Sequence, residues 1–426
     1  MAWNLAVDQR PAAVVTAASA RDVIEVVDAA RTVGLRVAAQ STGHNAGPLH
    51  DLSATILLKM SALRAVQIDP VRRVARAEAG AWWADVTNAA AAYGLAALAG
   101  SSPDVGVAGY TLGGGMSWLA RSRGLAANSV VALEVVTADG TPRRVDADHD
   151  PDLFWALRGG GGSFAVVTAL EFRLYPITEV YAGALFFPVQ RASEVLQAWR
   201  EWLPSVPDEI TSVGRILRFP PMPELPAQLS GRSFVVIEAA CQLPADQADA
   251  VLEPLRRLGA ELDTFHPTPV TELSKLHMDP PAPVPGHGDG MLLTGLSAEA
   301  IDAFSAASDA SGTSLLSMEL RHLGGALRPG AMAGGAVSGF DADFAFFAVG
   351  IVPTPQAVRE VHSALIAVQN AMAPWSTGGC YLNFAEARKT GQTLFGAATY
   401  RRLQDVKAAY DPADVIQGNH EVPPAR

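Results

Sequence analysis

Four glycine-rich clusters constrain the fold of this chain more than any other feature of its sequence. They span residues 40–47, 101–116, 158–165 and 377–384. Because glycine has no Cβ atom, runs of this density let the backbone turn tightly and approach a flat ligand closely. The chain has 38 glycines and 29 prolines among 426 residues, which is above average usage. Their clustering, rather than their number, is the guide to function.

Charge and cysteine content restrict the kinds of partner that we expect. The 43 acidic residues outnumber the 32 basic ones, giving a formal charge of −11. This charge argues against nucleic acid and anionic membrane surfaces as partners. The charged residues Asp8 and Arg10 lie where a signal peptide needs its apolar core, and no apolar window is long enough to span a membrane. Two cysteines, Cys241 and Cys380, cannot build a disulfide framework or a zinc site alone. We therefore expect a cytoplasmic protein with no metal.

The secondary-structure pattern changes once along the chain. Residues 1–175 read as alternating short strands and helices, and Tyr175-Pro176 is a plausible boundary. Longer pairs of a strand followed by a helix come next, and this pattern is typical of an α+β domain in which helices cover one face of a sheet. The proline-rich stretch 280–288 reads as an exposed loop or lid. After Trp375 the pattern becomes irregular again, with a last helix near 397–408. We predict one domain over 1–175, completed by 375–426, and a second over 176–374.

Two of the clusters carry motifs with a nucleotide-binding character. The first follows a strand, and its free backbone N–H groups suit a pyrophosphate, yet a phosphate loop does not need the imidazole of His44. A polar turn with an incidental histidine is the other interpretation. The third cluster has a formal G-x-G-x-x-A match from Gly160 to Ala165. Because a helix precedes it and a strand follows, the order is the reverse of a Rossmann fingerprint, and we reject that interpretation.

Two further segments place reactive side chains together. If residues 377–384 form a strand, Tyr381 and Asn383 point to the same face, where they could be core or catalytic residues. In the expected strand 314–321, alternation puts Ser317, Glu319 and Arg321 on one face. Glu319 is a candidate base and Arg321 a candidate anchor for an anionic group. An ordinary ion pair between the two is the alternative.

Taken in order, these segments resemble the berberine-bridge-enzyme-like group of FAD-linked oxidases, in the superfamily of vanillyl-alcohol-oxidase or PCMH-type FAD-binding proteins. The resemblance covers nearly the whole chain. It rests on the His44 loop and on residues 94–95, 112–115, 124–126, 135–140, 152–159, 381–383, 402–412 and 419. It implies a PCMH-type FAD-binding domain of two α/β subdomains, and a substrate domain with an antiparallel sheet backed by helices.

The resemblance also implies how FAD is held. Its pyrophosphate would lie on the first glycine loop, and His44 would be bonded to the flavin 8α-methyl group; non-covalent FAD is the alternative. Ser102 stands where many relatives carry the cysteine of a second link to flavin C6, so we expect no 6-S-cysteinyl bond. The implied cofactor-binding residues are Ser41, Thr42, Gly43, His44, Asn45, Ser102, Val105, Gly106, Gly109, Tyr110, Gly113, Asn128, Gly162, Val166, Tyr381, Asn383 and Asn419.

The reaction that the resemblance implies is removal of a hydride from an alcohol, amine or related small secondary metabolite, with electrons passed to O2 to give H2O2. Tyr381 is the leading candidate for the base and Glu319 the second. We expect burial near positive charge to lower the pKa of the Tyr381 phenol. A dehydrogenase with another acceptor and a non-catalytic flavin-binding paralogue are the alternatives. The intact Tyr381 and Asn383 argue against the paralogue. Substrate identity and oligomeric state stay open.

Overall fold

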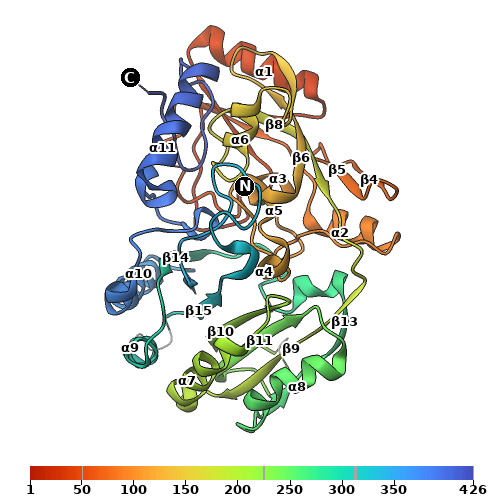
Figure 1. The fold of residues 1–426 in the computed structure, drawn as a ribbon. Helices are drawn as coiled ribbons and strands as arrows, with labels where there is room; N and C mark the ends of the chain where they lie inside the picture. The colour runs from red at the N-terminus through yellow and green to blue at the C-terminus, as the bar shows by residue number, and fades with distance from the viewer. Residues whose placement is uncertain (50, 224–225, 311–313, 426) are drawn as a thin grey trace.

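The computed structural model describes residues 1–49, 51–223, 226–310 and 314–425. Three sheets organise it, of three, five and eight strands. The two smaller sheets use strands between residues 13 and 173, and the largest uses strands between 179 and 351. Figure 1 shows the largest sheet below and the smaller sheets above it. The predicted α+β class is confirmed.

The three-stranded sheet positions the first glycine cluster. Its strands are parallel, in the order β1 (Ala13–Thr16), β3 (Thr55–Lys59) and β2 (Arg36–Gln40). Helix α1 (Ala20–Val33) precedes β2; Ser19 and Asp22 form a capping box at its start, and Gly34 ends it in the left-handed conformation. The His44 loop leaves the carboxyl end of β2, the end at which open α/β sheets bind ligands.

The five-stranded sheet is antiparallel and packs beside the first. Its order is β4 (Val66–Asp69), β5 (Val74–Glu78), β8 (Val166–Arg173), β6 (Val130–Val136) and β7 (Pro142–Val145). Short helices α2 (Trp83–Ala91), α3 (Val107–Leu112), α4 (Ala120–Arg123), α5 (Ala126–Ser129) and α6 (Pro151–Leu157) lie between its strands in sequence. Val37 of β2 and Leu170 of β8 belong to one hydrophobic core, so the two small sheets form one packed unit.

The eight-stranded sheet is antiparallel and has a different face on each side. Its order is β12 (Leu262–Asp263), β9 (Glu179–Pro188), β11 (Ser233–Cys241), β10 (Ile210–Arg218), β15 (Ser317–His322), β16 (Phe344–Ile351) and β14 (Gly286–Leu293), and β13 (His266–Pro269) also pairs with β9. Helices α7 (Ala192–Trp202), α8 (Ala245–Arg256), α9 (Ala298–Ala310) and α10 (Pro355–Met372) contribute to the core on one face (Figure 1). The other face carries the side chains that line a cavity.

The last segment of the chain returns to the first sheet. Helix α11 (Gly391–Tyr410) is kinked at Gly396, and Ile416 forms a parallel bridge with Val37 of β2. Leu403 and Val406 join the core of the small sheets. The domain limits given above stay a prediction. None of the described helices is long and apolar enough to cross a membrane.

One strand was missed from the sequence, and two predicted boundaries are wrong. Strand β10 was not predicted, because Gly214, Arg215 and Arg218 interrupt its apolar pattern. The proline-rich loop ends earlier than expected, since β14 already begins at Gly286. Helix α11 begins at Gly391, where Thr390 caps it by accepting a hydrogen bond from the Thr393 N–H.

Candidate active site

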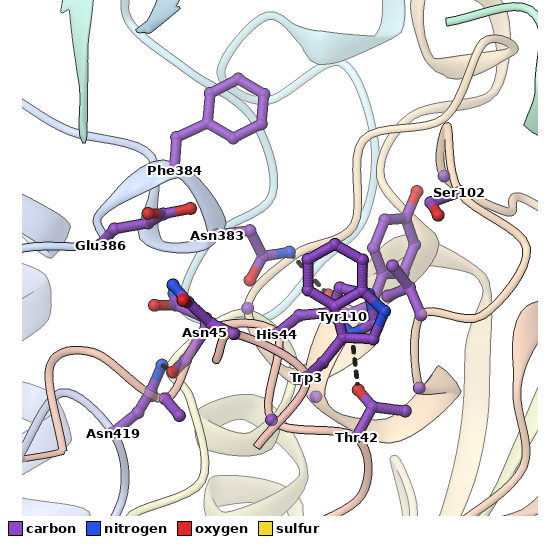
Figure 2. Close-up of a pocket in the computed structure, with 18 of the residues that line it drawn as sticks. Trp3, Thr42, His44, Asn45, Ser102, Tyr110, Asn383, Phe384, Glu386 and Asn419 are labelled. Atoms are coloured by element: carbon purple, nitrogen blue, oxygen red, sulfur yellow. Dashed lines mark hydrogen bonds between the residues drawn. The ribbon is translucent and has the colours of Figure 1, made fainter. Parts of the chain in front are cut away.

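A large cavity lies between the small sheets and the open face of the eight-stranded sheet. Its volume is about 440 Å³. All four glycine clusters reach its wall, as do strands β10, β15 and β16 and the C-terminal residues 417–419. Segments far apart in the sequence therefore build one site, part of which is drawn in Figure 2.

The first cluster supplies a cradle with unsatisfied polar groups. Gly43 has φ +82°, and a Cβ there would collide with the Gln40 side-chain amide. The buried Ser41 Oγ, Asn45 Oδ1 and Tyr110 Oη atoms find no hydrogen-bond partner among the described residues, although all three residues line the cavity. Leaving such groups unpaired costs about 1–3 kcal/mol each. Their arrangement fits a polar cofactor such as FAD.

His44 is held in a defined orientation on this wall. Its ring stacks on Trp3 with centroids 4.3 Å apart, and Nδ1 lies 2.7 Å from Thr42 Oγ1. On the other side, Nε2 lies 3.5 Å from Asp104 Oδ1. Burial raises the pKa of Asp104, but hydrogen bonds from His44, Ser102 and Trp3 outweigh it and lower the pKa overall. The imidazole therefore faces a carboxylate that stays ionised (Figure 2 shows its stacking and the Thr42 contact).

No thiol stands beside His44 in the described lining of the cavity. Ser102 Oγ donates a hydrogen bond of 2.8 Å to Asp104 Oδ1. Cys241 and Cys380 are both buried and neither lines the cavity. Burial raises the pKa of each thiol to about 12, so both are inert structural residues at neutral pH.

Tyr381 and Asn383 adjoin as expected, but through a turn rather than a strand. The turn is a 3₁₀ helix, η6 (Leu382–Phe384). Asn383 Nδ2 and the Gly115 N–H each donate a 2.9 Å hydrogen bond to the Tyr381 hydroxyl oxygen. The predicted lowering of the Tyr381 pKa is wrong: burial raises it to about 12, against the hydrogen bonds and the positive charge of Arg321.

Glu319 and Arg321 face the cavity, and their face of β15 is the one that alternation predicted. Both Glu319 carboxylate oxygens are occupied: Arg321 Nε lies 2.7 Å from Oε1 and His277 Nε2 lies 2.6 Å from Oε2. Burial raises the pKa of Glu319, but Arg321 and His277 reverse this and hold it far below its usual range. Glu319 is therefore an ion-pair partner, and its proposed role as a base is not supported by this geometry.

The ion pairs continue deeper into the sheet. His277 Nδ1 lies 2.7 Å from Glu238 Oε2. The Arg215 guanidinium lies 3.1 Å from Glu238 Oε1 as an ion pair and donates a hydrogen bond of 2.8 Å to the His277 carbonyl oxygen. Burial and Arg215 lower the pKa of His277, but Glu238, Glu319 and Asp279 raise it to about 9. The ring is thus an imidazolium held between two carboxylates.

Two of the seventeen implied cofactor-binding residues do not line the cavity. The Asn128 side chain accepts a hydrogen bond from the Leu125 N–H and donates one to Ala333 O, so it holds the start of α5. Val166 is fully buried in the core. Because side chains alternate along β8, its neighbours Ala165 and Val167 face the cavity instead.

Several lining residues were missed from the sequence: Trp3, Arg215, His277 and Glu386. Arg215 could have been found only by recognising β10, whose alternation aims it at the cavity. Trp3, His277 and Glu386 lie in irregular segments, where no helix or strand periodicity predicts which way a side chain points. Among the described residues, no group of three or more His, Cys, Asp or Glu side chains is arranged to hold a metal ion.

Comparisons with known protein families cover both ends of the chain. Residues 11–146 match the family described as FAD binding domain, and residues 380–423 match the family described as Berberine and berberine like. The uncharacterized FAD-linked oxidoreductase YgaK of Bacillus subtilis is 27% identical over 436 aligned positions, covering 99% of this chain and 93% of that protein. The (R)-6-hydroxynicotine oxidase of Paenarthrobacter nicotinovorans is 36% identical over 169 positions, covering 40% of this chain and 37% of that protein.

Solved structures share the same fold over the full length. The 6-hydroxy-D-nicotine oxidase from Arthrobacter nicotinovorans superposes with a TM-score of 0.84 at 23% identity, covering 100% of this chain and 95% of that one. Chitooligosaccharide oxidase gives a TM-score of 0.84 at 20% identity, covering 100% and 94%. At these identities the likeness concerns the fold alone.

Proposed function

We propose that this chain, which belongs to the berberine-bridge-enzyme-like group of FAD-linked oxidoreductases, is an oxidase of a small alcohol, amine or related secondary metabolite that passes electrons to O2 and forms H2O2. One observation carries the proposal. Unpartnered polar groups on the glycine loops and the Tyr381 hydroxyl face the same cavity. A cofactor and a proton-transfer group can therefore meet there.

The residues that would hold FAD are those of the glycine loops. Residues 41–45 and Gly106 form one wall, and Tyr110, Asn383 and Asn419 add polar contacts around it. FAD supplies the hydride acceptor when it is bound. We propose a single covalent bond from His44, whose imidazole is fixed by Thr42, Trp3 and Asp104. Ser102 carries no thiol for a second one.

The chain's own contribution is positioning and proton transfer. Tyr381 would accept the substrate O–H or N–H proton at its hydroxyl oxygen as the hydride leaves. The Gly115 and Asn383 donors, with Arg321, stabilise the phenolate, which is the accepting form. Burial keeps that form scarce at neutral pH, so activity should rise with pH.

The test begins with acid precipitation of the purified protein. Yellow colour in the washed pellet of the wild type, lost in His44→Ala, would support the covalent bond. Colour that washes out of the wild type would contradict it. A substrate screen then compares H2O2 formation with reduction of an artificial dye. Dye reduction without peroxide would identify a dehydrogenase, and bound flavin with neither activity would identify a flavin-binding paralogue.

A further inference from the structure

The cavity face of the large sheet is divided into a charged part and an apolar part. Strands β10 and β15 present Arg215, Glu319 and Arg321, whereas β16 presents Phe347, Val349 and Ile351. In the charged part, Arg215, Glu319 and Arg321 each have an ion-pair partner of opposite charge. The apolar part borders one carboxylate, that of Glu386, which the proposed chemistry does not use.

Glu386 accepts one hydrogen bond from the described residues, and its carboxylate and the Phe347 ring both approach Gly288. Oε2 accepts a bond of 2.8 Å from the Gly288 N–H, and no other hydrogen bond or ion pair to Glu386 is formed by the described residues. A Cβ on Gly288 would lie 2.8 Å from Phe347 Cζ and 3.2 Å from Glu386 Oε2. The end of the ring and the carboxylate thus converge on one point.

Aromatic rings connect this point to the proton-transfer group. The Phe347 and Phe384 centroids are 4.9 Å apart, and those of Phe384 and Tyr381 are 5.0 Å apart. Arg321 lies 5.0 Å from the Phe384 ring centroid. The Phe384 ring therefore already has a positive charge beside it. Phe347, which lies near Glu386, is the aromatic ring of this row that is available to a second cation. Figure 2 shows Glu386 and Phe384 on the same side of the pocket.

Among the residues that the structure describes, no neighbouring cation forms an ion pair with Glu386. Lys389, which follows it in the chain, pairs instead with Asp289 of β14. His420 contacts the backbone of Ala385 through Nε2, and burial lowers its pKa to about 4, so it is neutral. Burial and Asp289 raise the pKa of Glu386 to about 7, against the Gly288 hydrogen bond. A carboxylate in such surroundings gains from an external counter-charge.

We propose that Glu386 and Phe347, next to Phe384, form a subsite that binds a protonated amine of the substrate. An ammonium group pairs with the carboxylate and rests on the faces or edges of aromatic rings through cation–π attraction. FAD cannot fill this role, because its ionised groups are phosphates. The inference rests on the proposed function and narrows its substrate class to cationic amines with an apolar body.

The test measures binding to the flavin-loaded protein by calorimetry under nitrogen. The probes are benzyltrimethylammonium and neutral benzyl alcohol, at about pH 8 and about pH 5.5, on either side of the Glu386 pKa. We expect the wild type to bind the cation about tenfold more tightly than the alcohol at the higher pH, and to lose this preference at the lower pH. Glu386→Gln should weaken the cation about tenfold and leave the alcohol unchanged.

Two further variants define the result. Phe347→Leu should weaken the cation a few-fold, by roughly the lower end of a cation–π contribution, and spare the alcohol. Glu360→Gln removes the same charge from an exposed residue of α10 that does not line the cavity, and should change neither Kd. Equal loss of both probes in Glu386→Gln, or no cation preference in the wild type, would overturn the subsite. A wild-type protein that holds no flavin would overturn the proposed function instead.

Discussion

Asn383 Nδ2 donates a hydrogen bond of 2.9 Å to the hydroxyl oxygen of Tyr381. The Gly115 N–H occupies a second acceptor position on the same oxygen, also at 2.9 Å. Two donors on one phenol favour its ionised form, while burial favours the neutral form and raises the pKa to about 12. Tyr381 lines the cavity, so its phenol can exchange a proton with a group bound there. Asn383 is therefore a positioning residue, and Tyr381 is the group that exchanges the proton.

Tyr381→Phe removes the proton acceptor and keeps the ring. We expect the rate of flavin reduction in stopped-flow experiments to fall by about 10²–10⁴, the usual contribution of a general base, with flavin content unchanged. In the wild type the rate should climb with pH through the neutral range, since the pKa of the phenol lies near 12.

The matched control is Tyr93→Phe, which removes an exposed hydroxyl and should leave the rate unaltered. A Tyr381→Phe protein that reduced its flavin at a near-normal rate would show that another group takes the proton.

The Gly109→Ala substitution distinguishes an effect on FAD binding from an effect on protein stability. Gly109 lies in helix α3, and a Cβ there meets no atom within 4 Å. Alanine should stabilise the flavin-free protein by up to about 1 kcal/mol, because it is the better helix former. The same methyl group would enter the cavity where FAD is proposed to lie. We expect FAD content, measured from the absorbance of the purified protein, to fall severalfold. Full FAD occupancy in a stable variant would place the cofactor elsewhere.

Sequence reasoning located the glycine loops well because their residue types carry the information. Gly43, His44 and Tyr381 occupy the cavity wall without any knowledge of strand partners. The prediction that Val166 faces the cofactor is wrong by one position, since the direction of a side chain on β8 depends on the exact strand register. A one-residue error exchanges the buried face for the cavity face.

The charge network could not be predicted in the same way. Arg215 and Glu238 come from two neighbouring strands, and His277 comes from the irregular segment after η3 (Val270–Lys275). Only the folded sheet brings them within 3.1 Å or less of their partners. The pKa values of Tyr381 and Glu319 depend on burial and on nearby charges, so the direction of the Tyr381 pKa shift and the ionised, paired state of Glu319 could not be predicted from the sequence.

His277→Gln should show the stabilising effect of the imidazolium through its pH dependence. Its pKa is raised to about 9 in the folded protein, so its contribution is complete below about pH 6.5 and is lost as the pH rises through 9. The shift corresponds to about 3 kcal/mol. Urea unfolding of wild type and variant should therefore give a larger difference in free energy at about pH 6 than at about pH 10. Glu319 stays ionised over this range and does not contribute to the slope. A difference that grew with pH would contradict an imidazolium between the two carboxylates.

Lys407→Met tests the attachment of the C-terminal segment to the cavity wall. The Lys407 ammonium is fully buried; it donates to Ser163 O and Ile416 O at 2.7 Å and pairs with Asp411 at 2.5 Å. Ser163 follows the lining residue Gly162, and Ile416 precedes the lining residues 417–419, so one side chain ties together two parts of the site. Because methionine leaves the buried Asp411 carboxylate without its cation, we expect a loss of about 3–5 kcal/mol in the free energy of unfolding and a lower flavin content.

Lys275→Met is the control for this change. Lys275 pairs with Glu272 at the surface, where its side chain is 67% exposed, and its loss should cost about 1 kcal/mol or less. The two variants remove the same charge and add the same side chain, so urea unfolding compares burial directly. Equal, small losses in both would mean that the Lys407 contacts contribute no more than a surface ion pair, and that α11 and the tail are held to the small sheets by apolar contacts such as Leu403 and Val406 alone.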